Sequence, residues 1–176
     1  MFRNIVKEWA MRYRPIRHNA ATNKRFFECD GIADIMDLLQ GVRGQGSPFV
    51  VIDTSIDGRV INKLFRRSYG IYFFVKNELS GRPDAVSGQE EAKELALKTA
   101  LRFLWRMRKE KVGIPISPGC VRNDIRLKHV RVDEPNIQIQ GIGPFVNNYW
   151  GAWMVIDVDS PVAGCDDLSE DLYEPI

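Results

Sequence analysis

Two aspartates near the end of the chain, Asp157 and Asp159, have the spacing that comes closest to a metal site. Side chains two residues apart on a strand point to the same face, so both carboxylates could approach one cation. No histidine and no further cluster of carboxylates accompanies the pair. The spacing therefore favours a strand end that enters an acidic tail, and we predict no bound metal.

Two other patterns resemble ligand-binding loops but are incomplete. Gly41, Gly44 and Gly46 have the spacing of a phosphate loop, yet a helix is expected before them and a strand after, the reverse of a dinucleotide site. Residues 53–58, Asp-x-Ser-x-Asp-Gly, resemble the start of a calcium loop, but Leu64 stands where such a loop needs glutamate. We therefore expect no cofactor.

The histidines and cysteines form no motif for nucleophilic or redox catalysis. His18 and His129 belong to no nucleophile motif. Cys29, Cys120 and Cys165 are far apart in the sequence, with no C-x-x-C pair, so free thiols in a reducing cytoplasm are the default interpretation. A catalytic site assembled only in three dimensions stays open, but the sequence predicts a protein that is not an enzyme and has no catalytic residues.

Charge is distributed unevenly along the chain, although the net charge is only +2. Residues 1–28 and 102–111 are rich in arginine and lysine, whereas residues 157–174 contain acidic residues and neither lysine nor arginine. Three interpretations stay open. The charged runs could be solvated faces, they could steer copies of the chain together head to tail, or the basic ones could contact nucleic-acid phosphates.

Length and composition indicate one globular domain. The 176 residues are 44% hydrophobic and 27% charged, which argues against wholesale disorder. The apolar runs are far shorter than the roughly 20 residues that a membrane helix needs, and the N-terminus lacks the apolar run of a signal peptide. We expect a single α+β structural domain over residues 1–160, an acidic C-terminal tail over residues 161–176, and no membrane partner.

Apolar residues three and four positions apart predict three helices. The first two span residues 2–13 and 30–41, with Asp30 as the N-terminal cap of the second. The third is the strongest element of the sequence. It begins with a capping box at residues 87–90, Ser-Gly-Gln-Glu, and continues for about 24 residues to Gly113.

Alternating and β-branched runs predict the strands. An Asp-Gly pair at residues 57–58 indicates a hairpin turn. The order of elements predicts an α+β fold, a mostly antiparallel sheet packed against one long helix and two shorter N-terminal helices. Neighbouring aromatic residues such as Phe73 and Phe74 must point to opposite faces, so the second face needs a cover of its own or a partner. The predicted strands are residues 24–28, 49–53, 59–64, 68–76, 122–132, 136–141 and 149–158.

Several of these segments, taken together, resemble a known family. Residues 23–30, Asn-Lys-Arg-Phe-Phe-Glu-Cys-Asp, follow the His18 segment and precede a short helix and a glycine loop. Residues 141–153, Gly-Ile-Gly-Pro-Phe-Val-Asn-Asn-Tyr-Trp-Gly-Ala-Trp, lead into the last strand, and a hairpin and the long helix lie between the two segments. Over most of residues 1–160 this arrangement resembles small phage and prophage head–tail junction proteins, in particular tail-terminator or tail-completion proteins.

The resemblance implies a small α+β subunit that closes into a ring, commonly a hexamer, at the end of a tail tube. Such a ring ends tube growth and joins the tail to the capsid connector. The implied partners are other copies of the chain, the tail tube protein and the head–tail connector proteins. The implied location is the virion, in the tail or at the head–tail junction, after assembly in the host cytoplasm.

A ring needs a heterologous interface, in which two different patches of one subunit meet. The uneven charge suggests that a basic patch of one subunit meets an acidic patch of the next. The alternative is a nucleic-acid-binding module that uses its basic helices. The predicted interface residues are Arg14, Arg17, Arg106, Arg108, Asp157 and Asp159.

Overall fold

A computed structural model of the chain describes residues 2–42, 46–61, 64–79, 81, 83–114, 123–134 and 137–161. Of the predicted acidic tail, residues 161–176, only Pro161 falls within the described residues, as the end of the last strand. The elements are α1 (Phe2–Arg12), β1 (Phe26–Cys29), α2 (Ile32–Gly41), β2 (Phe49–Ile61), β3 (Leu64–Lys76), α3 (Ala85–Val112), η1 (Ile125–Leu127), β4 (Ile139–Ile142), η2 (Val146–Asn148) and β5 (Tyr149–Pro161).

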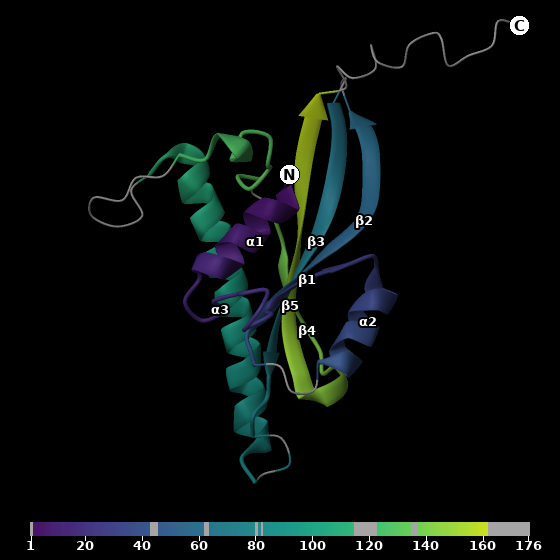
Figure 1. Cartoon of the computed structure of the whole chain (residues 1–176), viewed down its shortest axis with the longest axis vertical. Coiled ribbons are helices and arrows are strands. Elements are labelled where there is room, and N and C mark those ends of the chain that lie inside the picture. The colour runs from purple at the N-terminus through teal and green to yellow at the C-terminus, as the bar shows by residue number, and fades with distance from the viewer. Residues whose placement is uncertain are drawn as a thin grey trace, which may run out of the picture.

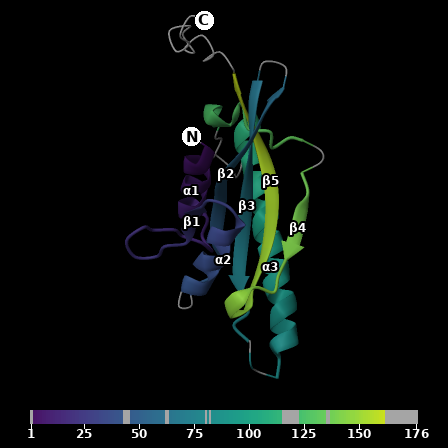
Figure 2. The same cartoon turned by 90° about the vertical axis from the view of Figure 1, so that its right-hand side faces the viewer.

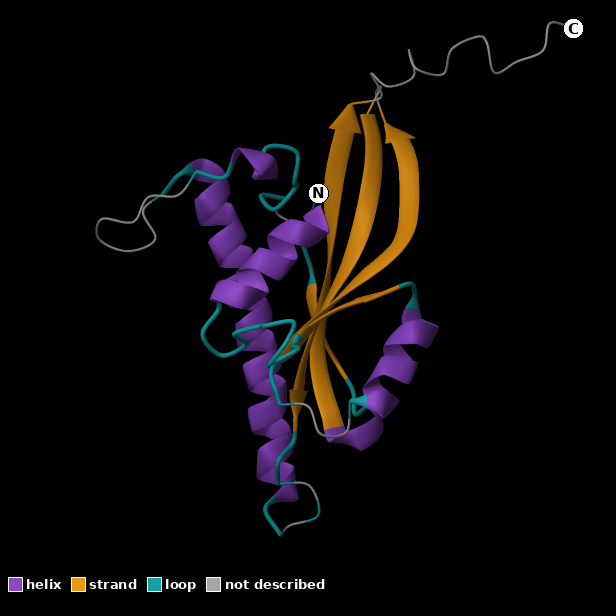
Figure 3. Cartoon of the chain, in the orientation of Figure 1, coloured by secondary structure: helices purple, strands orange, loops and turns teal. Residues whose placement is uncertain are grey.

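The strands form one five-stranded sheet in the order β1-β2-β3-β5-β4 (Figure 3). β1 runs parallel to β2, and every other neighbouring pair is antiparallel. The longest ladder joins β3 to β5, from Leu64 opposite Pro161 to Lys76 opposite Tyr149. The predicted α+β fold, with a mostly antiparallel sheet, one long helix and two shorter N-terminal helices, is confirmed.

Helices cover both faces of the sheet over part of its length. α1 and α3 lie on one face and α2 on the other, as Figures 1 and 2 show. Side chains alternate between the two layers: Val50 and Ile52 belong to the first core, beneath α1 and α3, while Phe49 and Val51 belong to the second, beneath α2. The continuous apolar run at the start of β2 is therefore that of a strand covered on both faces.

Beyond α2 the sheet continues as three strands only. We call this part the strand extension; it comprises residues 57–61 of β2, 64–68 of β3 and 157–161 of β5, paired with one another throughout. In Figure 1 it projects past α2, and its tip projects past the helices of the other layer. The free edge of β5 here is partly closed, because Arg131 N donates to Asp157 O and Asp159 N donates to the carbonyl of His129.

The hairpin turn predicted at Asp57-Gly58 is wrong. Both residues pair within the ladder, and Ile61 lies opposite Leu64, so the strands continue to residue 61 before the chain reverses. Gly58 lies directly under the Phe65 ring, where a Cβ atom would clash. The glycine that indicated a turn instead makes room for a cross-strand aromatic side chain.

The predicted helix caps are also wrong, because both helices begin at other residues. α2 starts after Gly31, whose φ of 92° favours glycine, and the amide of Asp30 donates to the Asp34 carboxylate. α3 starts before the predicted capping box and has no side-chain cap. Its C-terminal end at Gly113 agrees with the sequence, since this residue adopts the left-handed conformation with φ of 71°.

The strand predicted over residues 122–132 is wrong as well, and residue 122 lies outside the described part. The segment forms η1 and turns, with one isolated bridge between Val130 and Val158. Its alternating residues Leu127, Val130 and Val132 are buried in the first core without belonging to a strand. The other predicted strands are present with shifted ends. Of residues 59–64, residues 59–61 belong to β2 and Leu64 to β3; of residues 136–141, residues 139–141 belong to β4. Residues 62, 63 and 136 lie outside the described part.

Candidate functional site

The two predicted interface arginines on α3 bind groups within their own subunit. Arg106 Nε lies 2.8 Å from Oε1 of Glu110, a carboxylate that is only 1% exposed and that Arg12 also contacts. Arg108 donates through Nε to the carbonyl of Val132, at 2.5 Å. These contacts fix α3 to α1 and to the segment after η1. Because both guanidinium groups already have partners within the subunit, they are less available to pair with acidic groups of a neighbouring subunit.

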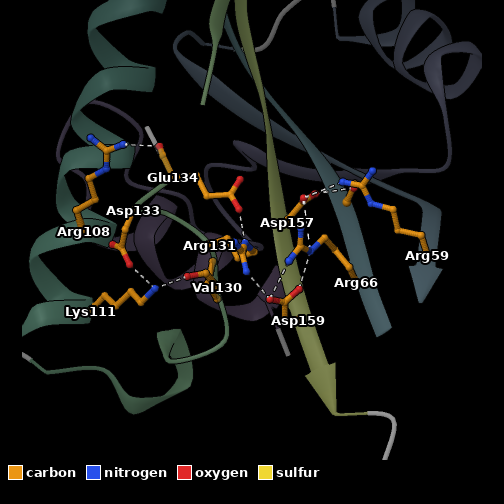
Figure 4. A network of polar contacts seen from close by, with 11 residues as sticks. Arg59, Arg66, Arg108, Lys111, Val130, Arg131, Asp133, Glu134, Asp157 and Asp159 are labelled. Atoms are coloured by element: carbon orange, nitrogen blue, oxygen red, sulfur yellow. Dashed lines mark hydrogen bonds and ion pairs between the residues drawn. The ribbon is translucent and has the colours of Figure 1, made fainter. Parts of the chain in front are cut away.

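The predicted acidic residues belong to an ion-pair network on the strand extension, drawn in Figure 4. Asp159 accepts hydrogen bonds from Arg66 Nε at 2.7 Å and from Arg131 Nη1 at 2.9 Å. The bond from Arg66 is the main cause that holds the pKa of Asp159 below its ordinary value. Asp157 accepts a 2.6 Å hydrogen bond from Ser68 Oγ. Both carboxylates thus join strands to one another and to the segment beside β5.

The register places this network on one face of the strand extension, together with Ile61 and Leu64. The other face carries Val60, Phe65, Arg67, Val158 and Ser160. Arg66 lies opposite Asp159 on the polar face. On the reverse face Val60 lies opposite Phe65, and the Val60 side chain is 68% exposed. The Arg67 guanidinium lies 5.2 Å from the centre of the Phe65 ring. The strand extension is therefore two-faced. Its reverse face, which we call the apolar face, is closed on the β5 side, where Phe2 of α1 lines a small cavity with Val158 and Ser160, and is open at Val60.

Arg14 and Arg17, the remaining predicted residues, lie just after α1 and are exposed. Within the described part of the chain, neither guanidinium has a hydrogen-bond or ion-pair partner. They are thus the two predicted interface residues whose charge remains available. The structure does not bring them together with Asp157 and Asp159 in any contact within the subunit.

Arg14 lines a groove between α1 and α3 that the sequence interpretation missed. Its volume is about 450 Å³, and its walls combine guanidinium groups with aromatic rings. Arg102 donates to the Tyr13 hydroxyl at 3.0 Å, and the Tyr13 ring stacks on Trp9. Trp105 is 51% exposed. We call this the arginine groove; it is lined by Trp9, Arg12, Tyr13, Arg14, Pro15, Arg102, Trp105 and Arg106.

A signal for the groove exists in the sequence but is spread over two distant segments. Trp9 and Tyr13 are four residues apart on α1, and Trp105 lies on the flank of α3 that widens its apolar face. Each pattern alone predicts only a buried helix face. The groove forms where α1 crosses α3, and the periodicity of each helix does not predict that crossing.

The aromatic residues on the second face of the sheet are only partly covered. Phe74 is fully buried beneath α2, whereas Phe73 belongs to the first core. Further along the face, Tyr72 and Trp153 stack with ring centres 6.0 Å apart and remain half-buried. The neighbouring Val155 is 40% exposed. The sequence predicted that this face needs a cover or a partner. The structure supplies α2 as the cover, but α2 ends before Tyr72, Trp153 and Val155.

The residues first considered for catalysis or metal binding have structural contacts. Buried His18 accepts a hydrogen bond at Nδ1 from the Arg25 amide, and burial lowers its pKa. Burial raises the pKa of the Cys29 thiol to about 11. Asp53, from the calcium-like pattern, accepts bonds from the Gly31 and Ser55 amides at the start of α2. Cys120, Cys165 and Gly44 lie outside the described residues.

Within the described ranges, no group of three or more His, Cys, Asp or Glu side chains is placed to hold a metal ion. The helices of that same part of the chain include none that is long and apolar enough to span a membrane. No protein-family model matches the chain, and no curated protein matches it.

Proposed function

We propose that this chain is a structural subunit that assembles with copies of itself into a ring. The observation that carries the proposal is the strand extension, a three-stranded part of the sheet that projects past the helical layers (Figure 1). Its apolar face is open at Val60, which is exposed, and at Phe65, which is half-buried. Exposed apolar surface rimmed by charged residues is typical of protein–protein interaction sites.

The edge of β2 supports the same proposal. β1 pairs with β2 only from Val50 to Asp53, so residues 57–61 have no partner on their outer side among the described strands. An open strand edge presents unpaired backbone donors and acceptors that another chain can bind. In the proposed ring, the open edge and the apolar face of one copy contact a different surface of the next copy. Such a contact is heterologous, as ring closure requires.

The particular role that we propose is that of a tail terminator. This role rests on the sequence resemblance, and the α+β architecture with a projecting hairpin is compatible with it. The ring would stand at the end of a tail tube in a virion, stop tube growth and join the tail to the capsid connector. Its partners would be other copies of the chain, six to a ring as the resemblance implies, the tail tube protein and the connector proteins.

Light scattering after size-exclusion chromatography tests the assembly. The wild-type chain is expected to give a discrete species several times the 20.2 kDa subunit mass. Val60→Asp places a charge on the apolar face and is expected to shift this species toward the monomer. Val86→Asp is the matched control, because Val86 is a valine of similar exposure, 70%, on the first turn of α3. A monomeric wild type, or equal effects of both substitutions, would contradict the proposal.

A nucleic-acid-binding module is the second candidate, and the arginine groove is the observation that favours it. Aromatic rings interleaved with arginines are typical of surfaces that stack single-stranded bases. Micromolar affinity for DNA that falls steeply with salt would support this candidate. Affinity that is weak and independent of salt would count against it.

A further inference from the structure

The arginine groove carries positive charge that its own subunit leaves uncompensated. Arg12 and Arg106 share the buried carboxylate of Glu110. Arg14 has no partner among the described residues, and Arg102 is bonded to the neutral hydroxyl of Tyr13. Two guanidinium groups at the groove are therefore available to bind carboxylates, which they recognise in planar, bidentate geometry.

The groove also exposes apolar surface. Trp105 is 51% exposed, and Leu101, one helical turn before it on α3, is 56% exposed. Pro15 and the stacked Trp9–Tyr13 pair form the opposite wall. A ligand that fits such a groove needs carboxylates for the arginines and apolar side chains for the rings. An acidic peptide that contains leucine or tyrosine has this chemistry.

The chain itself contains a segment of this kind. Residues 162–176, which lie outside the described residues, include no lysine or arginine. In the segment, carboxylates are interspersed with large apolar side chains. The carboxylates are Asp166, Asp167, Glu170, Asp171 and Glu174, and the large apolar side chains include Leu168, Leu172 and Tyr173.

The segment starts close enough to reach the groove of its own subunit. Ser160, next to the end of β5, and Phe2, at the start of α1, line the same small cavity. From there α1 runs toward the groove over its 11 residues, a length of about 16 Å. Figure 1 shows α1 starting beside β5 and crossing α3. Fifteen residues can span up to about 50 Å when extended, so the distance leaves ample slack.

We propose that residues 162–176 bind in the arginine groove of their own subunit. The carboxylates pair with Arg14 and Arg102, and the leucine and tyrosine side chains pack on Trp105. Tethering makes this an intramolecular event with an effective concentration in the millimolar range. Any other acidic ligand of the groove must therefore displace the segment. This inference does not rest on ring assembly and can fail or succeed independently of it.

Cross-linking of the full-length chain tests the proposal through the native Cys165. Leu101→Cys places a thiol beside the groove, and Val112→Cys is the control, at an exposed position about 16 Å later on the same helix, toward the end of β5. Both variants carry Cys120→Ser. Cys29 can stay, because it is buried and its pKa of about 11 keeps the thiol protonated. A short bismaleimide is added, and product masses are followed over time under denaturing conditions.

The expected result is a cross-link within one chain that forms at least about tenfold faster at position 101 than at position 112. Adding 1 M salt should slow the reaction at position 101, because the ion pairs are screened. Arg14→Gln together with Arg102→Gln should slow it as well, with an unchanged circular dichroism spectrum. These residues are chosen because neither contacts Glu110.

Three results would overturn the proposal. A rate at position 112 equal to or above that at position 101 would mean that the segment has no preference for the groove. A product of twice the subunit mass would assign the groove to the segment of a neighbouring copy. An uncross-linked protein that binds oligothymidylate with micromolar affinity would assign the groove to nucleic acid.

Discussion

The two ends of the central strands differ in how they are covered. Near α2, β2 and β3 are buried on both faces, and Phe49, Phe73 and Phe74 have no exposed surface. In the strand extension the same two strands carry Arg66 of the ion-pair network on one face and Val60, which is 68% exposed, on the other. The comparison indicates that one half of the sheet supplies the stability of the subunit, while the other half presents a surface.

The sequence of β3 changes at the boundary between these halves. Residues 71–75, Ile-Tyr-Phe-Phe-Val, are nearly all apolar, as a strand covered on both faces requires. Residues 64–68, Leu-Phe-Arg-Arg-Ser, place arginine and serine on the face that holds the ion-pair network. One continuous strand thus serves as core at one end and as surface at the other.

The largest effect that this comparison predicts is that of a core deletion. Phe74→Ala removes a fully buried ring from the second core and should lower the free energy of unfolding by about 3–5 kcal/mol. Val60→Ala, in the strand extension, should change it by less than about 0.5 kcal/mol. Urea denaturation measures both. Similar losses of unfolding free energy in the two variants would contradict the distinction between the helix-covered half of the sheet and the strand extension.

The polar face of the strand extension should contribute an intermediate amount. Asp159→Asn removes the charge that accepts hydrogen bonds from Arg66 and Arg131, and it should cost about 2 kcal/mol of unfolding free energy. Glu94→Gln is the control, because its pair with Lys98 is exposed on α3 and should contribute less than about 0.5 kcal/mol. If Asp159→Asn lowers the free energy of unfolding no more than the control does, the network does not stabilise the strand extension.

The smallest effect concerns pH and the buried His18. Burial is the main cause that lowers its pKa in the folded chain, so the unfolded chain binds a proton more readily. Stability should therefore fall as pH drops below about 6.5, the ordinary value for histidine. His18→Gln should reduce this loss, whereas substitution of exposed His129 by glutamine should retain it. Denaturation at pH 7.5 and pH 5.5 measures the difference, and an unchanged pH dependence in His18→Gln would contradict it.

The sequence predicted the helices better than the turns, because helical periodicity is a local property. The stripe from Phe2 to Tyr13 needs only its own residues to be recognised. The turn at Asp57-Gly58 was misplaced because the role of Gly58 depends on Phe65, a side chain of the next strand. The alternation over residues 122–132 predicts a strand, but in residues 123–132 it arises from burial in the first core without strand geometry.

The candidate surfaces were predictable only in part, since charge in a sequence does not reveal its partner. Arg106 and Arg12 are far apart in the chain but share Glu110, so an apparent basic cluster proves to contain an internal ion pair. Arg14 remains exposed, as an interface charge would have to be. The arginine groove depends on how α1 crosses α3, which neither helix specifies alone.

Hydrogen exchange at two protein concentrations tests the central claim most directly. If the strand extension is the assembly surface, amides of residues 57–61 should exchange more slowly at high concentration, where copies associate, than at low concentration. Amides of α2, which covers the second core, should exchange at the same rate in both. Unchanged exchange at residues 57–61 in a sample that light scattering shows to be assembled would contradict the claim.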